Sequence, residues 1–214
     1  MAKKPASDGM TVIQPANIVR TTIEVVGMAP FVQNKFPQKA RQMMMRTMAA
    51  SPADRKKIKS ERGARDYDAD FIGAQHIAEK GWNGIPCVAF RAAMIDACRT
   101  TGIPMTVAKM SVFIIADGID KDDGTSLVKI IGDKPEKIES LVKNETGVAD
   151  IRIRPMWRKW GAKVQIEFDA DMISAESVVN LLDRAGRQVG IGEGRNFSKK
   201  SVGQGWGSFV VVTK

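Results

Sequence analysis

The chain is poor in the residues that build metal and redox centres. Its 214 residues include one histidine, one tyrosine and two cysteines. A structural zinc site needs four Cys or His ligands, so the sequence predicts no metal centre of that kind. Cys87 and Cys98 are eleven positions apart, and Cys98 lies on an apolar helical face. We therefore expect two buried thiols rather than a disulfide.

Long apolar segments are also missing. No run of residues has the length and apolarity of a membrane span, and the start of the chain lacks the charged-then-apolar pattern of a signal peptide. We expect a cytoplasmic protein without membrane partners, in which residues 1–18 form a solvated tail or arm. The length favours a single domain over residues 1–214.

Acidic residues are outnumbered by basic ones. The chain has 33 Lys and Arg against 24 Asp and Glu, a formal net charge of +9 and a pI of about 9.7. A strongly basic balance of this kind predicts a polyanionic partner.

Two common nucleotide-binding motifs are absent, although residues 186–207 are rich in glycine and bordered by basic residues. No Gly-Lys-Ser/Thr occurs, which excludes a Walker loop. A dinucleotide fingerprint lies between a strand and a helix, whereas this glycine-rich loop follows a predicted helix and precedes a predicted strand. We therefore expect no cofactor. Gly190, Gly192 and Gly194 alternate, and in an extended stretch they would let a ligand backbone approach closely. The alternative is a helix C-cap at Gly186 followed by an ordinary loop.

Strand and helix patterns alternate along the chain. β-Branched or alternating residues predict five strands, and apolar spacing predicts two main helices, one of them capped by Ser174. A third, shorter helix is predicted from Asp133 to Gly147, because an Asp cap precedes a proline and a glutamate. These elements indicate an α+β fold, a ferredoxin-like or RRM-like antiparallel sheet with helices on one face. The predicted strands are 19–26, 107–115, 127–131, 163–168 and 208–213, and the main helices are 90–102 and 174–185.

A long insertion separates the first predicted strand from the first main helix. Residues 30–84 form this basic insertion, and a connection of that length should have its own structure or function. Apolar spacing from Ala40 to Met48 predicts one helix within it. Between positions 35 and 65 its many cations face only Asp54 and Glu61. Such a segment is either a solvated face or an arm that grips a nucleic-acid backbone or a neighbouring subunit.

A second basic segment contains tryptophans. Arg152 and Arg154 alternate as in a strand, and the following residues interleave Trp157 and Trp160 with cations. Single-stranded nucleic acid is bound by such mixtures, because cations contact phosphates while aromatic rings stack on bases. The alternative is that both tryptophans belong to the core.

The order of these segments resembles the RAMP superfamily, the repeat-associated mysterious proteins that bind RNA in CRISPR effector complexes. The resemblance rests on the first strand, the basic insertion, the segment Gly84-Ile-Pro-Cys-Val-Ala-Phe-Arg91-Ala-Ala-Met94 at the start of a helix, and the glycine-rich loop before the last strand. Ile85 to Arg91 is similar to the turn that opens the first helix in backbone subunits, with Cys87 and Ala89 in place of the family's usual Gly and Ser.

The resemblance implies a modified RNA-recognition fold in a subunit that oligomerises along a single strand, with an insertion reaching over its neighbour. It implies RNA as the favoured strand, antiviral defence as the role and other effector subunits as partners. Three alternatives stay open: a phage or mobile-element protein for single-stranded DNA binding or recombination, a RAMP endoribonuclease, and a structural assembly protein. The predicted nucleic-acid-binding residues are Lys35, Lys39, Arg41, Arg62, Arg65, Arg91, Arg152, Arg154, Trp157, Arg158, Lys159, Trp160, Gly190, Gly192, Gly194, Arg195, Lys199 and Lys200.

Catalysis is the minority hypothesis. His76 is the only candidate general acid or base, and a lone histidine is more often structural. Asp66, Asp68 and Asp70 alternate and would share one side of an extended segment, but they lack the turn glycine and closing glutamate of a calcium loop. The sequence therefore predicts no catalytic residue and no metal ligand.

Overall fold

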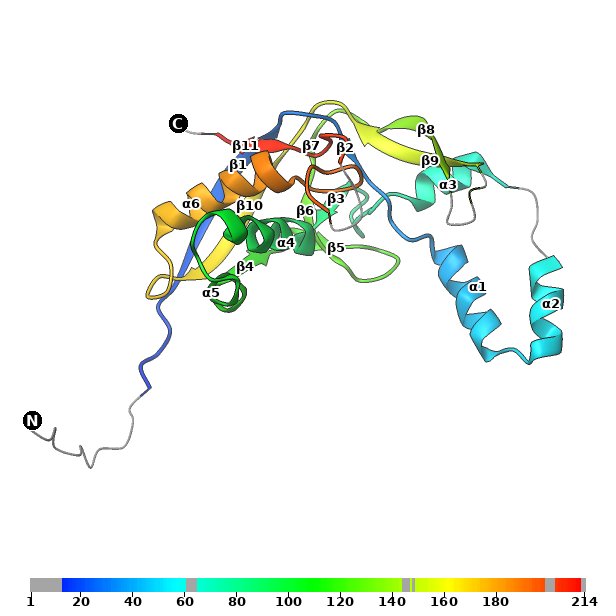
Figure 1. The fold of residues 1–214 in the computed structure, drawn as a ribbon, viewed down its shortest axis with the longest axis horizontal. Coiled ribbons are helices and arrows are strands. Elements are labelled where there is room, and N and C mark those ends of the chain that lie inside the picture. Colours follow the sequence, from blue (N-terminus) through cyan, green and yellow to red (C-terminus); the bar gives the residue numbers. More distant parts are fainter. Residues whose placement is uncertain (1–12, 61–64, 144–146, 148, 199–202, 213–214) are drawn as a thin grey trace, which may run out of the picture.

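The computed structural model describes residues 13–60, 65–143, 147, 149–198 and 203–212. Figure 1 shows a mixed body of strands and helices from which two helices project. The strands are β1 (Ile18–Gly27), β2 (Phe31–Val32), β3 (Gly84–Pro86), β4 (Val112–Ile115), β5 (Gly118–Ile119), β6 (Ser126–Lys129), β7 (Ile131–Gly132), β8 (Glu136–Lys143), β9 (Ala149–Trp157), β10 (Trp160–Asp169) and β11 (Phe209–Val211). The helices are α1 (Gln38–Ala49), α2 (Pro52–Ser60), α3 (Tyr67–Gly73), α4 (Cys87–Ala97), α5 (Met105–Ser111) and α6 (Ala175–Arg184).

The central sheet has the strand order β11-β1-β10-β4, with β7 also paired to β10, and all of its pairings are antiparallel. In chain order, its main elements are β1, α4, β4, β10, α6 and β11. The fourth strand thus lies beside the first, and the third lies between the first and the second. This arrangement is ferredoxin-like, so the predicted α+β fold class is confirmed.

The core lies between the central sheet and two helices, α4 and α6, which cover one face of it (Figure 1). Phe90 and Met94 of α4 and Leu182 of α6 are buried against Val164 and Ile166 of β10. Residues 163, 165 and 167 of β10 alternate with these buried positions and point to the opposite, less buried face. The predicted N-cap of α6 is confirmed, because the Ser174 side chain accepts a hydrogen bond from the Ser177 amide.

Two smaller antiparallel sheets extend this body, β2-β9-β8 and β3-β6-β5. Residues 30–84 contain β2, α1, α2, α3 and the start of β3, so the insertion has structure of its own. Figure 1 shows α1 and α2 side by side, projecting away from the central sheet, while α3 lies near β9. None of the described helices has the length and apolarity that a membrane crossing requires.

The strand predicted over 107–115 is wrong in its first half, where the chain forms α5. Pro104 precedes this helix with a φ of −59°, close to the value that proline fixes. Ala108 and Ser111, three positions apart, are both buried. Only from Val112 onward does the segment pair with β10, as β4.

The short helix predicted from Asp133 to Gly147 is also wrong. The segment forms β8, which pairs with β9 from Glu136–Met156 to Lys143–Ala149. Its local cap signals are outweighed by hydrogen bonds to a strand that comes later in the chain. Gly147 has a φ of +79° and belongs to the connection between these two strands.

Candidate nucleic-acid interface

A cleft of about 570 Å³ opens between the glycine-rich loop and the start of α4. On one side, the loop contributes residues 192–195. On the other, Ile85, Pro86, Val88 and Ala89 form the last residues of β3 and the first turn of α4. The structure thus brings together two of the segments that carried the family resemblance, although they are far apart in the sequence. Phe31, Gln33, Asn34, His76 and Ser198 complete the lining.

The first turn of α4 borders this cleft through Val88 and Ala89. Pro86 occupies the N-cap position, and no side chain of the described residues caps the helix there. Uncapped amide groups at a helix N-terminus carry partial positive charge and favour anions. Val88 is exposed, while Ile85 and Cys87 are buried, so the core anchors this turn.

The glycines of the loop have a structural reason that differs from the predicted one. Gly190, Gly192 and Gly194 have φ values of +74°, +80° and +73°, so the stretch is not extended. A Cβ on Gly192 would collide with the Val32 carbonyl oxygen and the Phe31 ring, and one on Gly194 would meet the Trp206 ring at 2.7 Å. These glycines therefore allow the loop to pack closely against other parts of the protein. The predicted close approach of a ligand does not explain them.

The loop is fixed to the body by backbone hydrogen bonds. The amide of Glu193 donates to the Val32 carbonyl at 2.9 Å, and that of Gly207 donates to the Pro30 carbonyl at 2.7 Å. A π-helical segment, Ala185–Val189, leads from α6 into the loop, so the helix continues past Gly186 and the alternative C-cap there is wrong. Ile191 is buried beside this segment, and the loop thereby contributes to the core.

The two tryptophans of the second basic segment lie in the core. Trp157 is 1% exposed and Trp160 is 3% exposed, and both rings pack on Phe31. The indole Nε1 of Trp160 donates to the Ala29 carbonyl at 2.8 Å. Rings buried in this way cannot stack on bases, so the predicted stacking role of both residues is wrong.

Most arginines of the predicted site are engaged within the protein. Arg154 pairs with Glu193 at 2.6 Å, Arg158 with Glu136 at 2.7 Å, and Arg152 with Asp150 at 3.5 Å. Arg65 contacts both Asp70 and Asp150.

Two further arginines of the predicted site donate to backbone carbonyls. Arg91 turns away from the cleft and donates to the carbonyls of Val112 and Lys109. Arg195 lines the cleft, and its Nη1 donates to the Gly192 carbonyl at 3.2 Å.

Lys35 was predicted to contact nucleic acid, and its burial contradicts this. The Lys35 side chain is 3% exposed, and its Nζ contacts Asp120 Oδ1 and Asp122 Oδ2, both at 2.7 Å. Burial alone would lower the pKa of Lys35, but the hydrogen bonds that its ammonium donates to Asp120 and Asp122 outweigh this effect and raise that pKa. The ammonium is thus a fixed partner of two carboxylates.

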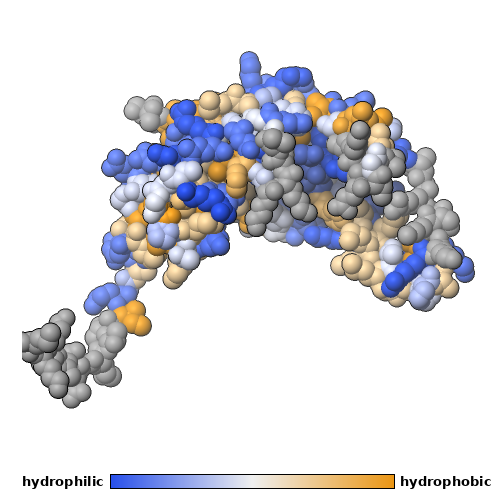
Figure 2. Space-filling view, viewed as in Figure 1, coloured by the Kyte–Doolittle hydropathy of each residue, from blue (hydrophilic) through white to orange (hydrophobic). Residues whose placement is uncertain are grey.

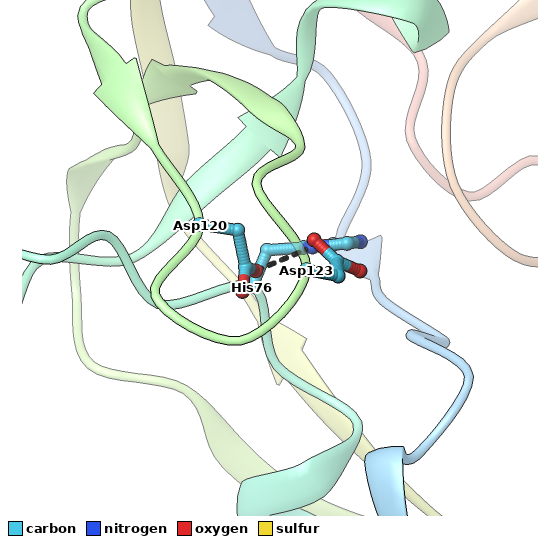
Figure 3. A group of neighbouring side chains, drawn as sticks. All are labelled: His76, Asp120 and Asp123. Atoms are coloured by element: carbon cyan, nitrogen blue, oxygen red, sulfur yellow. Dashed lines mark hydrogen bonds and ion pairs between the residues drawn. The ribbon is translucent and has the colours of Figure 1, made fainter. Parts of the chain in front are cut away.

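Asp120 is also the partner of His76. The Nδ1 of His76 lies 2.8 Å from Asp120 Oδ2, and the two side chains are 12% and 0% exposed. Figure 3 shows these side chains beside Asp123, which comes from the turn between β5 and β6. Ligand atoms of His76, Asp120 and Asp123 all lie within 4.8 Å of one another.

Asp66, Asp68 and Asp70 do not converge on a common point, because they belong to the start of α3 and not to an extended segment. Asp66 caps the helix by accepting from the amides of Asp68 and Ala69. Asp68 pairs with Lys137, and Asp70 pairs with Arg65. These carboxylates therefore have structural partners.

The remaining cations of the predicted site that the structure describes lie on the surface. Lys39 and Arg41 are exposed on α1, which follows the cleft residue Asn34 in the chain, and Lys159 is exposed between β9 and β10. Arg62, Lys199 and Lys200 lie outside the described residues. Figure 2 shows that the outline of the molecule is concave between its main body and the projecting helices α1 and α2.

The prediction from sequence missed Asp120 and Asp123. The segment Asp120-Lys-Asp122-Asp123-Gly124 has the composition of an acidic turn, which is a visible signal. Its proximity to His76, 44 positions earlier, is created by β-bridges that pair Ala78 with Asp120 and Ile77 with Asn83.

The two cysteines are buried thiols as predicted. Burial, with a smaller contribution from the charge of Asp117, raises the pKa of Cys87 to about 11.

No protein-family model matches the chain, and neither does any curated protein sequence. Among solved structures, the crystal structure of Cmr6 from Pyrococcus furiosus is similar over 92% of this chain and 99% of its own, at 12% sequence identity and a TM-score of 0.43. A similarity of this size is too weak to decide either fold or function. The ferredoxin-like assignment rests on the strand order alone.

Proposed function

We propose that the protein is a non-catalytic subunit that binds single-stranded nucleic acid without reading its sequence and oligomerises along the strand. The family resemblance favours RNA and a role in a CRISPR effector backbone. The observation that carries the proposal is the cleft, where the glycine-rich loop faces the uncapped first turn of α4. Backbone groups of this kind contact phosphates and carry no base-specific code.

The distribution of charged residues also supports the cleft as the binding surface. The cleft residue Asn34 shortly precedes α1 in the chain, and Lys39 and Arg41 are exposed on that helix. Within the described part of the chain, neither of these two cations is paired with a carboxylate, in contrast to Arg154, Arg158 and Arg65. A strand leaving the cleft toward α1 would therefore meet cations available for its phosphates.

The open face of the central sheet is a weaker candidate. RNA-recognition folds that bind through their sheet present aromatic rings on it. Here the corresponding positions of β10 are Lys163, Gln165 and Glu167, and Lys163 pairs with Glu24 of β1. Phe113 of β4, which pairs with Glu167, is an exposed ring on this face, but the Arg91 guanidinium already lies over it at 5.1 Å from the ring centroid. These positions therefore offer bases and phosphates fewer free partners than the cleft does.

Fluorescence anisotropy with labelled single-stranded RNA and DNA of one arbitrary sequence tests the proposal. If about six phosphates are contacted, the log-log slope of affinity against salt should be roughly −4. Replacing Lys39 and Arg41 with Ala should make the slope shallower by about 1.4 units, since each lost phosphate contact accounts for about 0.7. The labelled RNA should stay intact.

The matched control is the double Ala replacement of Lys109 and Arg184, which removes the same charge from exposed positions outside the cleft lining. Its slope should stay within experimental error of the wild type. A slope near zero in the wild type would refute the proposal, and tight self-association without nucleic-acid binding would favour a structural assembly protein. Higher affinity for DNA than for RNA would favour the phage or mobile-element alternative.

A further inference from the structure

An acidic cluster next to the cleft residue His76 is at odds with a polyanionic ligand. Lys35, Asp120, Asp122 and Asp123 bring three carboxylates and one ammonium together, which leaves two negative charges in excess. His76, which contacts Asp120, also lines the cleft. Charge of this sign beside phosphates is repulsive unless a cation compensates for it.

We infer that His76, Asp120 and Asp123 form a binding site for a divalent first-row transition-metal cation. An imidazole with two carboxylates is a ligand set that suits such cations. The 2.8 Å between His76 Nδ1 and Asp120 Oδ2 is close to the ~3 Å that separates adjacent ligand atoms around a metal with ~2.1 Å bonds. A cation can take the place of the proton between these two atoms with little movement, and the neutral imidazole then carries its proton on Nε2.

The surroundings hold the carboxylates in place. Asp120 Oδ1 accepts from Lys35 Nζ and from the Asp122 amide at 2.9 Å, which leaves Oδ2 directed at His76. Asp123 Oδ1 accepts from the Thr125 amide at 3.0 Å. Contacts of this kind fix the orientation of ligands around a metal and raise its affinity. Figure 3 shows the three side chains converging from two separate segments of the chain.

Asp122 provides a matched control, because it belongs to the same turn and carries the same charge as Asp123. Its carboxylate contacts Lys35 Nζ, however, and it is not part of the group of converging ligand atoms. Asp122→Asn and Asp123→Asn therefore remove equal charge from neighbouring positions, but only the second removes a ligand.

The experiment is titration of chelator-treated full-length protein with Mn²⁺ by calorimetry, without nucleic acid, followed by electron spin echo spectroscopy of the bound ion. We expect one Mn²⁺ per chain, with ¹⁴N modulation from the imidazole that is lost in His76→Gln. Affinity should fall at least about tenfold in Asp123→Asn and in His76→Gln, and no more than about fivefold in Asp122→Asn. Circular dichroism melts of each variant verify folding.

Three outcomes would each overturn the site. They are Mn²⁺ binding only in the millimolar range, equal losses of affinity in Asp122→Asn and Asp123→Asn, and bound Mn²⁺ without ¹⁴N modulation. Because no nucleic acid is present, these outcomes are independent of whether the cleft binds a strand.

Discussion

Arg154 and Glu193 form a 2.6 Å ion pair that ties β9 to the glycine-rich loop. Their side chains are 11% and 28% exposed, so the pair is partly shielded from water. Arg154 was expected to contact phosphates, but the geometry makes it a support for the loop that lines the cleft.

The first prediction concerns this pair. A double-mutant cycle of Arg154→Met and Glu193→Gln should give a coupling free energy of roughly 0.5–3 kcal/mol in urea denaturation, because removing either partner leaves the other poorly solvated. The equivalent cycle on Arg152 and Asp150, which are farther apart and more exposed, should give about 0–1 kcal/mol. Equal couplings in the two cycles would contradict a supporting role for Arg154.

The second prediction distinguishes packing from base stacking. Trp157→Ala should lower the free energy of unfolding by about 3–5 kcal/mol, because it empties a fully buried site against Phe31. Trp160→Phe keeps most of the ring and loses the hydrogen bond to Ala29, so it should cost less. Urea denaturation measures both, and anisotropy on the folded fraction should show unchanged affinity. Weaker binding with unchanged stability would restore the stacking hypothesis.

The third prediction concerns the glycine-rich loop. Gly192→Ala should destabilise the protein more than Gly102→Ala, although the two φ values are similar, +80° and +75°. A Cβ at 192 meets the Val32 carbonyl and the Phe31 ring, while one at 102 meets nothing within 4 Å. Gly102→Ala should therefore show only the backbone strain of about 1–2 kcal/mol. Thermal melts measure the loss of stability in each variant. Equal losses would mean that the loop shifts to accommodate the added methyl group.

The fourth prediction is a pH dependence set by Lys35 and Asp120. Burial alone would raise the pKa of Asp120, but hydrogen bonds from Lys35, the Asp122 amide and His76 lower it below its ordinary value. A carboxyl group whose pKa is lowered by folding stabilises the native state above its unfolded pKa of about 3.9. That stabilisation is lost as the pH falls toward the folded pKa.

Lys35→Met should therefore cost about 3–5 kcal/mol at neutral pH, because it leaves a buried carboxylate without its main partner. Without the ammonium, burial dominates and the pKa of Asp120 rises, so the variant should recover part of this loss as the pH is lowered. Urea denaturation of both proteins should show that the difference between their free energies of unfolding becomes smaller from neutral to acidic pH. A difference that stays constant with pH would show that Lys35 acts through packing alone.

Much of the central sheet could be predicted from the sequence, because its elements are encoded locally. The β-branched run that became β1, the apolar spacing of α4 and α6 and the Ser174 cap each carry their signal within a few residues. The basic insertion was recognisable for the same reason, since charge and length are properties of the segment itself.

Other features were decided only by tertiary contacts. β8 took its conformation from pairing with β9, against its own helix-start signals. Whether Trp160 stacks on bases or fills the core depends on Phe31, which lies far away in the sequence. Basic residues such as Lys35 and Arg154 looked alike in the sequence, but acquired different roles once the fold placed carboxylates within 3 Å of them. Composition thus determined the net charge of the protein, while the fold determined which cations are left for a ligand, because burial and pairing depend on neighbours that no local pattern specifies.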